Sequence, residues 1–577
     1  MSESHAIFNL EEILDQVLSL ARQGPDLDRQ TLYAAARVNS QWSTIALNYL
    51  WSDMTLQHLL YFIGYHNRKY PRCGGCNETS TRQWTARATR FNEFYAHRVR
   101  YMFLGFKYTD KLCAHFGAAL STISLFHMPK LHTLKLNIFP HPRNLELSQK
   151  FLQPTLERLS CKICKRVGMT TYPSVKEVLG ILDTLTTAYN VSYFRLRISL
   201  PREIPAQAFV DAFKDMANLE EVDLPPYLLS PTLISALSAH PSLKRVTCVT
   251  RPARGPRGGK FSPWDGSLGI DFDGPAPSPA DRFSNLTHIS LCTSLETASG
   301  LLSEGFSPGI LVSVNIMLRD LVLPSQVLTF TRQLSARHAR LQQFRLSAPE
   351  FDFSTIRQSA PRMLWSSLRP LRDCSHIQDF EVFWHTIVII TNEDIMEISK
   401  SWPKLRRLVL EGVDPQHVEE EATLSLDCLA PLAQNCLDLR HLSLHLSPAL
   451  ADNAETKTED DCSYSSCSRP ALFPNMSTAV FHLGLPLPPT HEVLRIAGLI
   501  GDAFPPGCVI SCPYLYKCER VSLDSGMFNQ YTSPGAPLTS WQTRQLNIMK
   551  FWQSVIWTLP EGQCKVRVTG DYEPRYS

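Results

Sequence analysis

Two cysteine pairs have the spacing that most resembles a chemical site. Cys73 and Cys76 are separated by two glycines, as in a zinc knuckle, and Cys161 and Cys164 have the same gap. Tetrahedral zinc sites commonly combine two such pairs. Cys161, however, takes the place of a strand leucine, which favours burial of its thiol in a core. We therefore expect Cys73 and Cys76 to be thiols in a connecting loop. Zinc binding, or enzyme chemistry at this pair, is the alternative.

Other catalytic motifs are incomplete. Gly259 and Lys260 lack the first glycine of a phosphate-binding loop, and His491 and Glu492 are followed by Arg495 where a zinc protease needs its second histidine. No G-x-S-x-G sequence occurs. The sequence therefore predicts a protein that is not an enzyme and needs no cofactor.

Charge and hydropathy restrict the partners. The chain has 577 residues, of which 44% are hydrophobic and 19% charged, a balance typical of a folded core. The chain has 57 Lys and Arg and 54 Asp and Glu, and it contains no long basic run. Nucleic acid is therefore not expected as a main partner. The most apolar stretch, 380–391, is shorter than the ~20 residues of a membrane span.

The first residues, MSESHAIFNLEEIL, carry acidic side chains where a signal peptide needs a basic region. We therefore expect an intracellular protein, in the cytoplasm or nucleus. Its 16 cysteines are then expected to be thiols.

A strand motif recurs between residues 128 and 446. A Pro or small residue is followed after one position by an apolar residue that opens L-x-x-L-x-L. The opening residues are Leu131, Leu156, Leu219, Leu243, Leu286, Leu341, Ile377, Leu405 and Leu439, with a weaker copy from Val191. The period of two predicts a strand with one buried face, and helical spacing follows between strands. Such units bury their apolar faces only when stacked.

These repeats resemble the leucine-rich repeat family, in its long and irregular form. The resemblance covers about residues 98–530 and implies an α/β solenoid of strand–helix units. A conventional doubly wound sheet with amphipathic strands is the alternative.

The first fifty residues have helical spacing. Leu10, Ile13, Leu14, Val17, Leu18 and Ala21 form one predicted stripe, and a second helix is expected from about Thr31. A third apolar series runs from Trp42 to Trp51. Three short helices cannot bury this much apolar surface alone, so a partner or the next domain must cover part of it.

The order of these residues resembles an F-box. The matching features are E-I-L at 12–14, the V-x-x-x-W step from Val38 to Trp42, and L-W at 50–51. The segment 84–101 is similar to the connector of fungal F-box-like proteins with leucine-rich tails. This resemblance implies that the head binds a Skp-type adaptor and, through it, a cullin. The predicted adaptor-binding residues are Phe8, Leu10, Ile13, Leu14, Val17, Leu32, Val38, Trp42, Leu50 and Trp51. A helical cap for the first repeat is the alternative.

Polar residues within the repeats could bind a target protein. The candidates are Lys135, Arg158, Glu221, Arg245, His288, Arg345, Glu381, Arg407 and His441. Stacked strands would place them in a polar strip of mixed sign, suited to a protein partner, and a solvated sheet face without a ligand is the alternative. We expect the histidines at outward positions, His132 among them, to be solvated.

The predicted order is a short helical head and one long stacked body. We expect an F-box-like domain at 1–55 and a connector with a helix at 56–106. The repeats are expected at 107–530, with exposed loops at 250–280 and 447–470, and a C-terminal helix and strand at 531–577 could cap the array. The favoured function is the substrate-recognition subunit of an SCF-type E3 ubiquitin ligase. A non-catalytic repeat scaffold is the alternative.

Overall fold

The computed structural model divides the chain into two compact units, Met1–Pro263 and Trp264–Ser577, which are considered separately. The residues that it describes are 12–20, 29–62, 78–105, 126–138, 148–163, 175–185, 190–198, 206–225, 228–229, 231–248, 283–304, 309–348, 361–386, 388–412, 424–446, 473–483, 504, 508–511 and 565–567. Phe8, Leu10, Cys73, Cys76, Cys164, both predicted loops and the predicted C-terminal helix lie outside these ranges.

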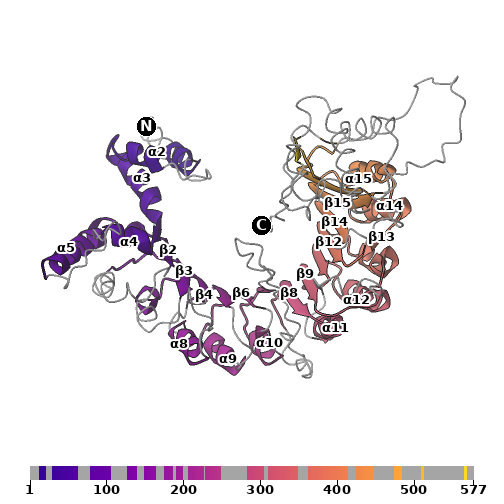
Figure 1. Cartoon of the computed structure of the whole chain (residues 1–577), viewed down its shortest axis with the longest axis horizontal. Coiled ribbons are helices and arrows are strands. Elements are labelled where there is room, and N and C mark those ends of the chain that lie inside the picture. The colour runs from indigo at the N-terminus through magenta and orange to yellow at the C-terminus, as the bar shows by residue number, and fades with distance from the viewer. Residues whose placement is uncertain are drawn as a thin grey trace, which may run out of the picture. The chain divides into compact units, whose positions relative to one another are not determined.

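The first unit begins with helices and continues as strands that alternate with helices (Figure 1). Its elements are a helix over 12–20, α2 (Arg29–Ala35), α3 (Ser40–Ser52), β1 (Asp53–Thr55), α4 (Leu56–Phe62), α5 (Glu78–Phe94), η1 (Ala96–Arg98), β2 (Tyr101–Gly105), β3 (Thr133–Ile138), β4 (Arg158–Ile163), α8 (Val175–Leu185), β5 (Tyr193–Ile198), α9 (Ala206–Lys214), β6 (Glu221–Leu224), α10 (Pro231–Ser238) and β7 (Arg245–Cys248).

The second unit repeats the strand–helix alternation. Its elements are β8 (His288–Thr293), α11 (Leu295–Glu304), β9 (Ser313–Leu318), α12 (Pro324–Arg337), β10 (Gln343–Ser347), β11 (Met363–Leu364), η6 (Trp365–Ser367), η7 (Arg369–Asp373), β12 (Asp379–Trp384), β13 (Val388–Ile389), α14 (Asn392–Ser401), β14 (Arg407–Gly412), η9 (Leu426–Cys428), α15 (Leu429–Asn435), β15 (His441–Leu446), β16 (Thr478–Leu483), β17 (Val509–Ser511) and β18 (Lys565–Arg567).

In both units the strands are parallel and follow sequence order. The first unit has the order β1 to β7, and the second has β8, β9, β10, β12, β14, β15, β16, β17 and β18. The short strands β11 and β13 pair separately. A doubly wound sheet would reverse its strand order at a switch point, which neither unit does. The predicted α/β leucine-rich-repeat solenoid is confirmed.

A tight turn explains why Pro so often precedes the opening residue. The backbone N–H of Leu131 donates to the Met128 carbonyl at 3.0 Å, and that of Leu405 donates to the Trp402 carbonyl at the same distance. Pro129 and Pro403 therefore occupy the second position of a four-residue turn, where a fixed φ near −65° is favourable. The turn brings the chain back to the start of the next strand.

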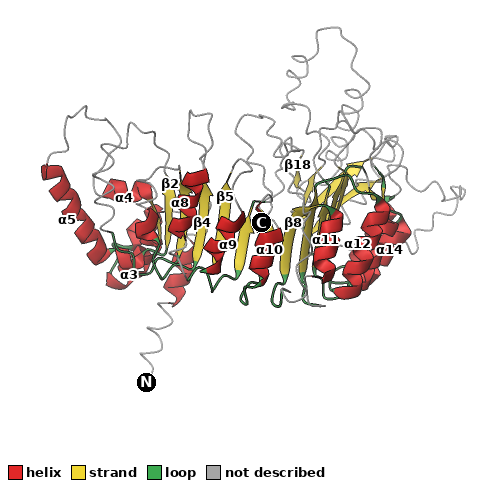
Figure 2. Ribbon diagram, turned by 90° about the horizontal axis from the view of Figure 1, so that it is seen from below, coloured by secondary structure: helices red, strands yellow, loops and turns green. Residues whose placement is uncertain are grey.

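The repeat core lies between the sheet and the helices. All the predicted opening residues, including that of the weaker copy at Val191, are at most 1% exposed. Within strands, burial alternates, so that Phe380, Val382 and Trp384 of β12 point inward while the residues between them are half-buried. Helices α8, α9 and α10 cover one face of the first unit's strands, and α11, α12 and α14 cover one face in the second (Figures 1 and 2). The other face of each sheet is called the open face below.

The motif search missed one central repeat. Leu311 is fully buried and opens β9, which lies between β8 and β10. Its sequence, LVSVNIML, has Val314 and Ile316 at the two buried strand positions, and Gly309 stands where several other copies have Pro. Because β-branched residues fill the same buried positions, the strand forms without the leucine pattern.

Candidate functional site

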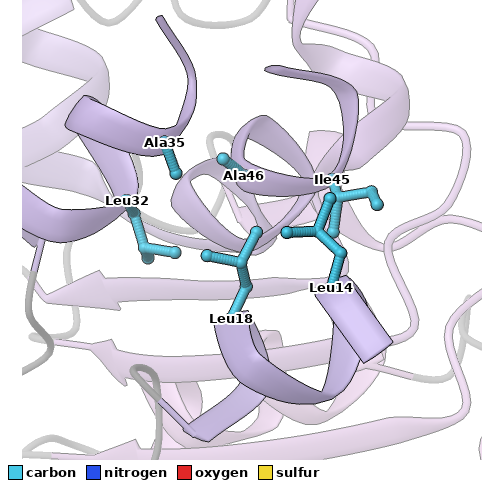
Figure 3. Close-up of a cluster of buried hydrophobic side chains, with 6 residues drawn as sticks. All are labelled: Leu14, Leu18, Leu32, Ala35, Ile45 and Ala46. Atoms are coloured by element: carbon cyan, nitrogen blue, oxygen red, sulfur yellow. The ribbon is translucent and has the colours of Figure 1, made fainter. Parts of the chain in front are cut away.

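The N-terminal helices enclose a small apolar core. Leu14 and Leu18 of the helix over 12–20 point toward α2 and α3 (Figure 3). The buried set is Leu14, Leu18, Leu32, Ala35, Ile45 and Ala46, with Ala36, Trp42, Tyr49 and Leu50 packed against it. Among the predicted adaptor-binding residues, Leu14 and Leu32 are therefore buried inside the head, and Trp42 and Leu50 are partly buried there.

Hydrogen bonds fix the ends of these helices. The Asn39 side chain accepts from the Trp42 backbone N–H at 2.9 Å and so caps α3. The Tyr49 hydroxyl donates to Asp15 Oδ1 at 2.8 Å and joins α3 to the helix over 12–20. The head is thus held as a unit by its core and by these polar contacts.

The predicted stripe of the first helix is divided between two faces. Leu14 and Leu18 are buried, whereas Ile13 and Val17 are 57% and 54% exposed. Adjacent helical residues differ by about 100° in direction, so Ile13 and Leu14 cannot both face the same small core. Leu20, Tyr33 and Val38 are also more than half exposed. The head therefore presents large apolar side chains that its own core leaves in solvent.

Trp51 connects the head to the connector helices. Its ring lies 4.3 Å from the Tyr95 ring and 5.9 Å from each of the Phe62 and Phe91 rings, measured between centroids. Arg98 Nη1 donates to the Thr44 carbonyl at 3.1 Å. The predicted adaptor-binding residue Trp51 is thus packed within this chain.

The target-binding candidates lie on the open faces, in two rows rather than one. In the first unit, Arg158, Glu221 and Arg245 share a row with Tyr193, and Lys135 lies in the next row with Arg195. In the second unit, His288, Arg407 and His441 share one row, and Arg345 and Glu381 share the next. Side chains in both rows point to the same face because they are two residues apart.

Ion pairs join the charged candidates of the second unit and offset part of their positive charge. Arg345 Nη1 lies 3.2 Å from Glu381 Oε2, and Arg407 Nη1 lies 3.5 Å from Glu381 Oε1. The Glu381 side chain is only 12% exposed, which weakens the screening of these pairs by water. The predicted polar strip is thus partly an internal network here.

The expectation that the outward histidines are solvated is wrong. His132, His288 and His441 are all half-buried between neighbouring strands. Burial lowers the pKa of His441 to about 4, and the positive charges of Arg407 and Arg440 act in the same direction. His441 is therefore neutral at pH 7.

Glu411, which lies beside this network, provides a test by pH. Its carboxyl accepts from the Ser443 hydroxyl at 2.8 Å, and burial raises its pKa to about 7, although the residue as a whole keeps some exposed surface. An unfolded glutamate ionises near 4.5, so the folded chain binds more protons between pH 4.5 and 7. The free energy of unfolding then falls as pH rises through this window. We expect Glu411→Gln to remove the fall and to stabilise the second unit by ~2 kcal/mol at pH 8.

Thermal unfolding of Glu411→Gln and the parent chain at pH 4 and pH 8 checks this prediction. The exposed Glu220→Gln is the control and should change stability by less than about 0.5 kcal/mol at both values. Equal destabilisation of Glu411→Gln at both pH values would contradict the assignment.

Among the described residues, no group of three or more His, Cys, Asp or Glu could hold a metal ion. Cys161 is fully buried on β4, as expected for a thiol in the place of a strand leucine. In the same part of the chain, no helix is both long and apolar enough to cross a membrane.

Comparison with known proteins gives structural likenesses only. No protein-family model and no curated protein sequence matches this chain. Rad7 from yeast, in its complex with Elc1, is 11% identical to this chain, with a TM-score of 0.36. The aligned region covers 89% of this chain and 93% of the Rad7 chain. An internalin from Listeria monocytogenes is 9% identical, with a TM-score of 0.27 and coverage of 73% and 96%.

Toll from Drosophila, in its complex with Spatzle, is 12% identical, with a TM-score of 0.26 and coverage of 74% of this chain and 53% of its own. None of these TM-scores reaches 0.5. The leucine-rich-repeat fold is therefore established by the strand order and the buried repeats of this chain itself.

Several polar residues of the open faces escaped the sequence search. Tyr193, Arg195 and Asp223 lie among the candidates of the first unit, and Asp379 and Glu411 lie among those of the second. Each is at a strand position of the same parity as a predicted candidate. Tyr193, Arg195, Asp223 and Asp379 occupy the third or fifth position of a motif copy, and Glu411 directly follows the copy that opens at Leu405. Taking both outward positions of every copy, and the next residue after it, would have found them, because alternate residues share a face.

Proposed function

We propose that this protein is the substrate-recognition subunit of an SCF-type ubiquitin ligase. The head would bind a Skp-type adaptor and through it a cullin, while the open faces of the repeats would hold a target protein. The observation that carries the proposal is the exposure of Ile13 and Val17 on the first helix and of Val38 in the turn between α2 and α3, in a head whose core is already formed by other side chains. Exposed apolar side chains of this size favour a protein partner.

Mixing the purified full chain with a purified Skp-type adaptor tests the head. We expect the two to elute together in size-exclusion chromatography at 10 µM, as a specific interface with a Kd of about 1 µM or lower would require. Separate elution of two folded proteins at this concentration would refute the adaptor contact.

A repeat scaffold without an adaptor is the second candidate. It is favoured by the contacts that Trp51 and Arg98 make between the head and the connector, because a solenoid needs a cover for its first strand. In that case the chain elutes alone, while substitutions in the head core still lower the stability of β1 and β2.

A further inference from the structure

The first unit carries a concentrated positive surface, whereas the sequence predicted a strip of mixed sign. The nine open-face residues of β3, β4 and β5 include five with positive charge and no Asp or Glu. We call this surface the basic face, and its members are Lys135, Arg158, Lys162, Arg195 and Arg197. Lys135, Arg158 and Lys162 are exposed, and the Arg195 side chain is 36% exposed.

Aromatic rings position these cations. The Arg158 guanidinium lies 4.2 Å from the centroid of the Tyr193 ring, and that of Arg195 lies 5.9 Å from the same centroid. Lys135 Nζ lies 5.7 Å from the Phe103 ring centroid. A ring face attracts a cation without neutralising it, so these contacts order Lys135 and Arg158 while the positive charge of both is retained.

Among the open-face residues that the structure describes next to β5, acidic side chains begin at the edge of this surface. On β6, Asp223 pairs with Arg195, and Glu221 Oε1 lies 3.9 Å from Arg245 Nη1 of β7. In the second unit, Arg345 also lies over a ring, at 4.9 Å from the Phe383 centroid, and pairs with Glu381 at 3.2 Å. The open face there carries Asp379, Glu381 and Glu411 beside Arg345 and Arg407. Aromatic contacts to cations occur in both units, but an excess of positive charge is found on β3 to β5.

We propose that the basic face binds an acidic peptide segment of a partner protein. Alternate side chains of an extended peptide are ~6.6 Å apart, the same spacing as alternate side chains along β4, and adjacent strands are ~4.8 Å apart. Carboxylates along one side of such a peptide can therefore meet Arg158 on β4 and Lys135, which lies diagonally across from it on β3. Arginine can hold a carboxylate with two parallel N–H bonds.

A peptide suits this surface better than a nucleic acid. The basic face is three strands wide, and the carboxylates of Glu221 and Asp223 lie at its border, where they would repel a continuing phosphate backbone. Nucleic-acid affinity comes largely from neutralising successive phosphates, so these carboxylates would weaken it. The proposal rests on the part of the proposed function that gives the repeats a target, and it does not require the adaptor contact.

Fluorescence anisotropy with the full chain at 0.15 M salt tests the proposal. The probe is a labelled 12-residue peptide of alternating Glu and Ser, with a Lys and Ser peptide and a 12-nucleotide single-stranded DNA as comparisons. We expect the acidic peptide to bind with a Kd below 1 mM and the basic peptide not to bind. Lys135→Gln combined with Arg158→Gln should weaken binding by about tenfold or more, since each charge-assisted contact contributes ~1.5 kcal/mol.

The matched control removes the same charge elsewhere. Arg87 and Arg90 are exposed residues of α5. The double variant Arg87→Gln and Arg90→Gln should bind the acidic peptide with an affinity within about twofold of the parent. Circular dichroism confirms that both double variants are folded. Absence of binding below 1 mM, equal weakening by both double variants, or tighter binding of the DNA than of the peptide would each overturn the proposal.

Adaptor capture by the same preparation separates this proposal from the previous one. Peptide binding by a chain that captures no adaptor refutes the head assignment and leaves the basic face supported. Adaptor capture without peptide binding has the opposite meaning.

Discussion

Replacing Ile13 and Val17 together with aspartate is expected to abolish adaptor capture without unfolding the head. Both side chains are more than half exposed and contribute little to the head core. At the centre of an interface, each would be buried against the adaptor, and a charge there would be desolvated without a partner. Loss of one such anchor commonly costs about 2 kcal/mol or more, so the Kd should rise at least ~30-fold. Titration of the variant with labelled adaptor measures this change.

Two controls separate contact from folding. Leu437→Asp places the same charge on an apolar side chain that is 59% exposed in the second unit, and it should bind the adaptor as the parent does. Leu14→Ala removes a buried side chain one residue from Ile13, and it should destabilise the head by ~2–5 kcal/mol. If the Ile13 and Val17 variant binds normally while remaining folded, these side chains do not form the adaptor contact.

Trp402→Ala is expected to have the largest effect on stability in the second unit. The ring is fully buried, 4.7 Å from the Phe380 ring and 6.0 Å from the Trp365 ring, measured between centroids. Its backbone also forms the turn that opens the repeat at Leu405. Removal of a buried tryptophan leaves a cavity and costs ~3–5 kcal/mol. Because each repeat depends on its neighbours, the loss should concentrate in β12 and β14.

Hydrogen exchange of the backbone amides of β12 and β14 measures this loss, and the amides of β3 and β4 serve as an internal reference. Trp402→Phe is the matched variant. It keeps an aromatic ring and removes the indole N–H, which is buried without a hydrogen-bond partner. We expect this substitution to lower the free energy of unfolding by less than about 1.5 kcal/mol. The smaller ring loses some packing, but the substitution also removes a buried N–H group whose desolvation was not compensated by a hydrogen bond. Uniform loss of protection across both units would contradict a local role.

The repeat motif was predictable because it depends on local spacing. A turn that often has Pro or a small residue at its second position, followed by alternate apolar residues, specifies where each strand begins and which side chains it buries. Leu131, Leu219 and Leu405 therefore lie where the pattern places them. The same spacing is present at β9, where Val314 and Ile316 take the places of both leucines, and valine also fills the first of these positions in the copies that open at Leu219 and Leu243.

The sequence alone determined the strand positions, the buried faces and the helical head, because these follow from the periods of strands and helices. Only the tertiary structure decided that Leu14 faces the core while Ile13 faces solvent, since the direction of the packed helices selects one side of a broad stripe. It also placed Glu381 between Arg345 and Arg407, residues on three neighbouring strands. Charge pairing across strands depends on register, which spacing within one strand does not contain.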